Sequence, residues 1–128
     1  MAHARRGTRK RDGFTLIEVL VGVVIIGILT LYALPAYITS VIATRQGTAN
    51  ANARELASQV QARAVGAGSY NTVVSSYAVD LGGALPNNPC TGTTTGYTIT
   101  ATTISATVIA TAGTNCGTWT PITYALTL

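Results

Sequence analysis

The sequence predicts an α+β protein in which one long N-terminal α-helix, half membrane anchor and half amphipathic, packs on a small antiparallel β-sheet. Three patterns predict this fold. An apolar run follows a basic tail, an alanine-rich stretch then repeats apolar residues at three- and four-residue spacing, and the C-terminal part alternates apolar residues with threonine. Of the 128 residues 48% are hydrophobic and only 9% are charged, which is too few charges for an ordinary soluble surface.

The first thirteen residues form a basic tail. Its charge of +4, which equals the net charge of the whole chain, comes from one acid, Asp12, and five basic residues: Arg5, Arg6, Arg9, Lys10 and Arg11. Beyond Gly13 the chain has no Lys, His or Met, and residues 81–128 carry no charged side chain. Acid–base catalysis, metal binding and phosphate contacts depend largely on such residues. The composition therefore argues against an enzyme, a cofactor or metal site, and a nucleic-acid-binding surface.

The apolar run of residues 14–34 is long enough to cross a bilayer. As a helix rising about 1.5 Å per residue it spans roughly 30 Å, the thickness of the hydrocarbon layer. The basic tail favours a cytoplasmic N terminus, with the residues after Pro35 outside the cytoplasm. We therefore divide the chain into a leader (1–13), a transmembrane helix (14–35) and a globular head (36–128). The alternatives are a secretory signal cleaved after the run and a plain signal anchor, which leaves the charge of Glu18 unexplained.

A second, amphipathic half of the helix is predicted from residue 36 to about residue 65. The charged residues lie off its apolar stripe, and Gly66 and Gly68 are expected to stop the helix. The stripe must be covered by another part of the chain, for which the C-terminal strands are the candidate. It consists of Ile38, Val41, Ile42, Ala49, Ala53, Leu56, Val60 and Ala64.

The C-terminal part predicts three antiparallel strands after a loop region at residues 66–96. Period-two alternation with β-branched residues is typical of strands with one covered face. The alternative is a disordered, threonine-rich tail, which the regular alternation disfavours. The residues expected on the covered faces are Tyr97, Ile99 and Ala101; then Ile104, Ala106, Val108 and Ala110; then Ile122, Tyr124, Leu126 and Leu128.

Cys90 and Cys116 are the only two cysteines. The predicted topology puts both outside the cytoplasm, where a disulfide is favoured over free thiols or redox chemistry. The bond would tie the loop before the first strand to the turn before the last. A cross-link of this loop length stabilises a small domain by roughly 3 to 4 kcal/mol in the chain-entropy model.

The junction between the tail and the apolar run carries a specific motif. It reads Lys10-Arg11-Asp12-Gly13-Phe14-Thr15-Leu16-Ile17-Glu18. This closely resembles the signature of the type IV pilin and pseudopilin superfamily, a type IVa-like prepilin with a class III leader. In that signature a short basic leader ends in glycine, and an acid follows the aromatic residue by four positions. The resemblance covers about the first quarter of the chain, and the order of helix, loop, strands and late disulfide resembles the pilin layout more coarsely.

The resemblance implies roles for five residues. A prepilin peptidase would cut between Gly13 and Phe14 and methylate the new amine of Phe14. In the assembled filament Glu18 would pair with the Phe14 amine of a neighbouring subunit; a protonated Glu18, or one that reaches the membrane interface, is the alternative. Residues 27–35, between Gly27 and Pro35, would unwind during assembly, because glycine and proline weaken a helix. A simple kink is the alternative.

These implications predict a structural protein that forms a helical homo-oligomeric filament. Before assembly it would lie in the bacterial inner membrane and bind the pilus assembly machinery. After assembly it would be part of an extracellular type IV pilus that serves adhesion, twitching motility or DNA uptake. A minor pilin and a pseudopilin of a type II secretion system are alternatives within the family. The neutral mature chain gives no electrostatic support for DNA binding. The alternatives from other classes are an enzyme, which the composition disfavours, and a membrane-anchored binding module that stays monomeric and keeps its leader.

Overall fold

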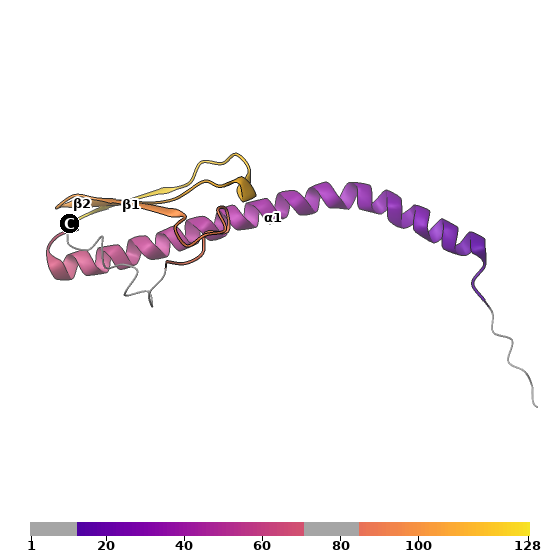
Figure 1. The fold of residues 1–128 in the computed structure, drawn as a ribbon, viewed down its shortest axis with the longest axis horizontal. Coiled ribbons are helices and arrows are strands. Elements are labelled where there is room, and N and C mark those ends of the chain that lie inside the picture. The colour runs from indigo at the N-terminus through magenta and orange to yellow at the C-terminus, as the bar shows by residue number, and fades with distance from the viewer. Residues whose placement is uncertain (1–12, 71–84) are drawn as a thin grey trace, which may run out of the picture. The chain divides into compact units, whose positions relative to one another are not determined.

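A computed structural model describes residues 13–70 and 85–128 and confirms the predicted α+β class (Figure 1). The elements are α1 (Leu16–Ala67), β1 (Tyr97–Ala101), β2 (Ser105–Ala110), the short 3-10 helix η1 (Thr114–Cys116) and β3 (Thr123–Thr127). The chain divides into two compact units, Met1–Tyr37 and Ile38–Leu128. Residues 1–12 of the predicted leader and residues 71–84 of the predicted loop lie outside the described residues.

The first unit is an apolar helix whose side chains face outward. Described residues 13–37 include no buried residue, and large apolar side chains such as Phe14 (81% exposed) and Leu31 (75%) are not covered by the rest of the described chain. The helix is long and apolar enough to cross a membrane. It also continues through Pro35, so the segment between Gly27 and Pro35 is helical in the single chain.

In the second unit the C-terminal half of α1 supplies one side of the core. The buried face confirms most of the predicted stripe and adds Ala57; four of its six residues are alanines, whose small side chains permit close approach of another layer. Ile38 was predicted in this stripe but is 50% exposed, and Val41 and Ile42 are only half-buried. The buried residues are Ala49, Ala53, Leu56, Ala57, Val60 and Ala64.

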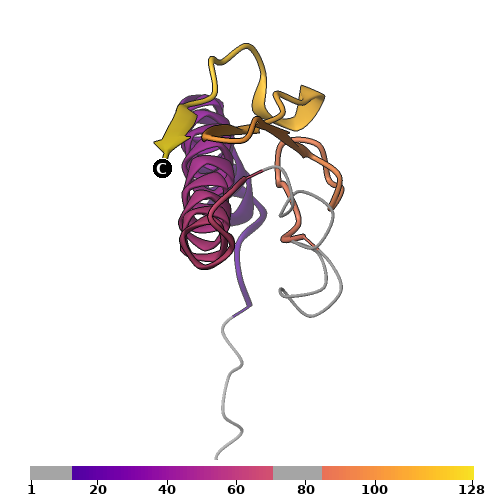
Figure 2. The same ribbon diagram turned by 90° about the vertical axis from the view of Figure 1, so that its left-hand side faces the viewer.

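The three strands form an antiparallel sheet in the order β1-β2-β3, lying along this half of the helix (Figures 1 and 2). Ala106, Val108 and Ala110 of β2 are buried, which confirms the period-two prediction for the central strand. The predicted covered faces extended too far at the strand ends. Ile104, Ile122 and Leu128 lie outside the strands and are at least half exposed, because alternation in sequence does not show where pairing stops.

The end of α1 is fixed by Gly68 and Tyr70. The helix ends at Ala67, and Gly68 adopts φ +69°, a left-handed conformation that closes helices and favours glycine. Tyr70 is fully buried; its hydroxyl donates to Gln61 Oε1 (2.7 Å) and its amide donates to Thr103 O (3.2 Å). The helix end is thereby attached to the turn between β1 and β2. The predicted stop is confirmed at Gly68, whereas Gly66 is still inside the helix.

Candidate functional site

The candidate processing site is the peptide bond between Gly13 and Phe14. Both residues precede the first turn of α1, are exposed and have no regular secondary structure. Apart from its neighbours in sequence, no described residue comes within 4 Å of the position that a Cβ would take at Gly13. A protease needs access to an unfolded stretch of backbone around the bond that it cuts. This bond meets that requirement, whereas the bonds after Leu16 are held in helix.

Glu18 lies in the first turn of α1 with an exposed side chain. Its amide donates to Thr15 O at 3.1 Å, as expected at the start of a helix. It is the only charged side chain between Phe14 and Arg45. Within the described part of the chain its carboxylate has neither a hydrogen bond nor an ion pair. A single acid on an apolar helix, without a partner among the described residues, is costly once water is removed.

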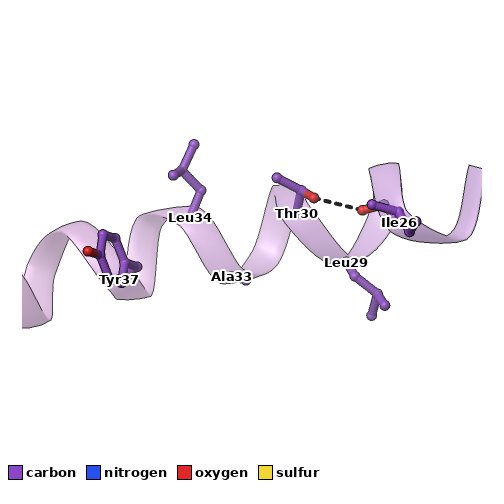
Figure 3. Close-up of a pocket in the computed structure, with 6 residues that line it drawn as sticks. All are labelled: Ile26, Leu29, Thr30, Ala33, Leu34 and Tyr37. Atoms are coloured by element: carbon purple, nitrogen blue, oxygen red, sulfur yellow. Dashed lines mark hydrogen bonds between the residues drawn. The ribbon is translucent and has the colours of Figure 1, made fainter. Parts of the chain in front are cut away.

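A shallow apolar hollow lies on α1 around Ala33, within residues 27–35 and their neighbours (Figure 3). Its polar side chains are Thr30 and Tyr37. The Thr30 hydroxyl donates to Ile26 O at 2.7 Å, one helical turn earlier, so its hydrogen is already used within the helix. The hollow therefore suits an apolar occupant. Its lining residues are Ile26, Leu29, Thr30, Ala33, Leu34 and Tyr37.

The two cysteines form the predicted disulfide in the second unit. Cys90 and Cys116 are both fully buried, with 5.0 Å between their Cα atoms. The bond links the segment before β1 to η1, between β2 and β3. The η1 end is also held by the helix, because Gln46 Nε2 donates to Cys116 O (2.9 Å) and Arg45 donates to Asn115 O (3.2 Å).

A buried asparagine beside the disulfide was not predicted. Asn88 is fully buried, and its Nδ2 donates to Gly96 O (2.5 Å) and Thr111 O (3.0 Å). Its Oδ1 accepts the Cys90 amide at 2.9 Å. One amide side chain thus joins the Cys90 loop, the start of β1 and the end of β2. Only its place two residues before a cysteine could have indicated this role, and that spacing does not by itself show that the side chain is buried.

Gly113, in the same region, is needed because the backbone of Cys90 lies very close to it. A Cβ at Gly113 would lie 2.1 Å from Cys90 O and 2.5 Å from Cys90 C, so any side chain there would push η1 away from the Cys90 loop. Gly113 O accepts the Cys116 amide at 3.1 Å. The glycine therefore brings the two halves of the disulfide together.

The predicted site residues form two separate groups. Gly13, Phe14, Glu18, Gly27 and Pro35 belong to the first unit, and the two cysteines belong to the second. Across residues 13–70 and 85–128, no three His, Cys, Asp or Glu side chains cluster closely enough to hold a metal ion.

Comparison with known proteins gives a match for the segment that holds most of the first group. Residues 8–34 match the family described as the prokaryotic N-terminal methylation motif. No curated protein and no solved structure matches the chain. The matched segment contains the Gly13–Phe14 junction, Glu18, Gly27 and nearly all of the exposed apolar helix. This family is structural and generally non-enzymatic. The chain therefore carries, over residues 8–34, the class III leader of type IV pilins and pseudopilins.

Proposed function

We propose that the protein is a structural subunit of a type IV pilus. The single observation that carries this proposal is the methylation motif at residues 8–34, which includes an exposed apolar helix that no other described part of the chain covers. Apolar surface on this scale must be covered by lipid or by protein. A subunit that passes from a membrane pool into a filament satisfies the requirement in both states. No catalytic role is proposed for any residue.

Processing follows from the exposed junction. A prepilin peptidase cuts after Gly13 and the new Phe14 amine is methylated. Before the cut, the positive tail keeps the N terminus on the cytoplasmic side of the inner membrane, with the second unit outside. Cleavage removes the side chains that carry the whole net charge of +4. The buried disulfide of the second unit agrees with an oxidising location.

Assembly is proposed to pair Glu18 with the Phe14 amine of a neighbouring subunit. The carboxylate has no partner within the described chain, and the new amine lies at the start of the same helix. In an apolar bundle each charge alone is expensive, and pairing them offsets much of that cost. The pair therefore favours one axial register between subunits and disfavours the others. Segment 27–35 then unwinds, which lets each second unit settle against its neighbours.

A pilus subunit is preferred to a pseudopilin because of the C-terminal composition. Major pseudopilins, by the resemblance, typically bind calcium near the C terminus. Calcium sites use carboxylate ligands, and residues 81–128 contain no Asp or Glu. A minor pilin shares all of these features. The amount of the protein in a filament distinguishes the two, since a major subunit builds the shaft and a minor one is present in a few copies.

The proposal is tested on filaments sheared from cells that make this protein as sole major subunit. Electron microscopy and peptide mapping should find the protein throughout the filament. Intact-mass measurement should give a chain that begins at Phe14 with one added methyl group. Filaments without this protein, or surface protein that still carries residues 1–13, would reject the proposed function.

The pairing is tested separately with Glu18→Ala, which should be inserted and cleaved normally but yield few filaments. Glu18→Gln keeps the shape and removes the charge, so it should share the defect. The matched control is Glu55→Ala, which changes an exposed glutamate in the second unit that accepts a hydrogen bond from Gln59 (3.1 Å). Normal filament yield from both Glu18 variants would disprove the pairing while leaving the pilus assignment intact.

A further inference from the structure

The outer edge of β3 has open backbone groups. In β2 the even-numbered residues face β3, because the Leu128 amide donates to Ile104 O (3.0 Å) and the register pairs Ala106 with Leu126 and Val108 with Tyr124. Alternate residues of a strand bond to opposite sides, so Thr123, Ala125 and Thr127 direct their backbone groups away from the sheet. Of these groups only Thr127 O has a partner in the described part of the chain, Gln61 Nε2 at 3.3 Å.

Within residues 13–70 and 85–128, this edge lacks the features that usually protect a strand edge. Natural edge strands carry charged residues, proline or bulges that prevent pairing with another chain. Residues 122–128 contain no charge and no proline, and the β2–β3 register is continuous from Ser105↔Thr127 to Ile109↔Thr123. The side chains on the open face, Thr123, Ala125 and Thr127, are small and exposed. A further strand could therefore bond to this edge without displacing any part of the described chain except the Gln61 amide.

A single cation lies on the helix flank beside this edge. Asn50 and Gln61 mark that flank, because Asn50 Oδ1 accepts the Ile122 amide (3.1 Å) and Gln61 reaches Thr127 O. Arg54 lies within about 40° of both around the helix, at 100° per residue. Its side chain is exposed, and no hydrogen bond or ion pair ties it to residues 13–70 or 85–128.

We propose that the outer edge of β3 docks an extended peptide segment of another protein, which adds a fourth strand and places an acidic side chain against Arg54. Added strands gain affinity from main-chain hydrogen bonds and specificity from side chains. A second copy of this chain fits less well, because the strands in its described residues, β1, β2 and β3, carry no charged side chain and leave Arg54 unpaired. The inference goes beyond the proposed pilus function and does not depend on it.

The test uses isotope-labelled full chain in detergent micelles and amide hydrogen exchange measured by NMR. The probe is a capped peptide of alternating valine and threonine with one central aspartate, and the matched probe has asparagine in its place. In the free protein the amides of Thr123, Ala125 and Thr127 should exchange quickly, whereas those of Tyr124 and Leu126 are protected. The aspartate peptide should slow the first set and leave the second unchanged. Slow exchange of the first set in the free protein, or no change at millimolar peptide, would overturn the proposal.

Two variants locate the binding. Ala125→Pro removes an outward amide that bonds to nothing in the sheet, so Tyr124 and Leu126 should stay protected while peptide affinity falls about ten-fold. Arg54→Gln should weaken the aspartate peptide by about two- to five-fold and leave the asparagine peptide unaffected. The matched control Arg45→Gln, on the opposite helix flank, should change neither affinity. Equal binding of both peptides to unaltered protein would reject the acidic partner, and full binding to the Ala125→Pro variant would reject the edge.

Discussion

Asn88→Ala is the substitution that most directly tests how the second unit is held together. Asn88 is fully buried and makes three hydrogen bonds, to Gly96 O, Thr111 O and the Cys90 amide. Alanine removes all three without altering the disulfide. If the C-terminal part depends on this one side chain, the loss should be comparable to the loss of the covalent cross-link.

The magnitude follows from what each partner loses. The Cys90 amide has no other acceptor in the described chain, and a buried donor left unpaired costs about 1 to 3 kcal/mol. Gly96 O keeps the Thr111 amide at 2.9 Å, and Thr111 is exposed enough for water to replace the lost donor. Each of these two bonds therefore contributes at most about 1 kcal/mol. We expect Asn88→Ala to lower the free energy of unfolding by about 3 kcal/mol.

The assay is urea unfolding of the full chain in detergent micelles, followed by the fluorescence of Trp119. This residue is the only tryptophan and packs against the core of the second unit. With an m-value of about 1 to 2 kcal/mol per molar urea, the midpoint should fall by about 1.5 to 3 M. The control is Asn87→Ala, an exposed neighbour that bonds through its backbone carbonyl. A change below about 0.5 kcal/mol for Asn88→Ala, which is typical of surface sites, would refute the reasoning.

Three further predictions concern other features of the chain. Replacing Cys90 and Cys116 by serine should cost about 3.5 kcal/mol for a sequence separation of 26 residues, measured by the same unfolding assay; an unchanged midpoint would show that the cross-link adds nothing. Burial raises the pKa of Tyr97 above its ordinary value of 10.0. A hydrogen bond from Asn52 lowers this pKa, but its effect is smaller than that of burial. The stability from neutral Tyr97 is thus present below about pH 10 and lost as pH rises further, so unfolding midpoints at high pH should fall less steeply in Tyr97→Phe; equal slopes would contradict this. In the filament, residues 27–35 should be at least partly non-helical, and five unwound residues would add roughly 9 Å of reach. A filament map with unbroken helix, together with normal assembly of the Gly27→Ala, Pro35→Ala double variant, would disprove it.

The parts of the fold that sequence predicts well depend on neighbours in the chain. Gly68 ends the helix through its own backbone conformation, and the alternation around Val108 reports directly which face of β2 is covered. Ile38 shows where prediction from spacing in the sequence fails. Its spacing puts it on the apolar stripe, but a covered residue also needs a covering element. Arg45 and Gln46, about two turns later, are the residues that bond to the η1 segment, through Asn115 O and Cys116 O.

The candidate sites also divide into those that nearby sequence predicts and those that depend on contacts between distant residues. Gly13, Phe14 and Glu18 could be selected as candidates from the sequence because they lie in a short, contiguous motif. Asn88 is missed because two of its partners, Gly96 and Thr111, lie 8 and 23 residues further along the chain and meet it only after the sheet has formed. The open edge of β3 is missed because an edge exists only once strand order is known, and composition does not report strand order.

The hydrogen bond from Thr30 to Ile26 O determines how the apolar helix responds to its surroundings. A threonine whose hydroxyl bonded to a group outside its own helix would be more stable in surroundings that offer such a group than in those that do not. Thr30 makes its bond within a single turn, so as long as residues 26–30 stay helical the bond is the same in lipid and in a detergent micelle. The part of the Thr30 side chain that contacts the surroundings is then chiefly its methyl group. This polar residue therefore adds little resistance when the helix exchanges one apolar environment for another, in either direction.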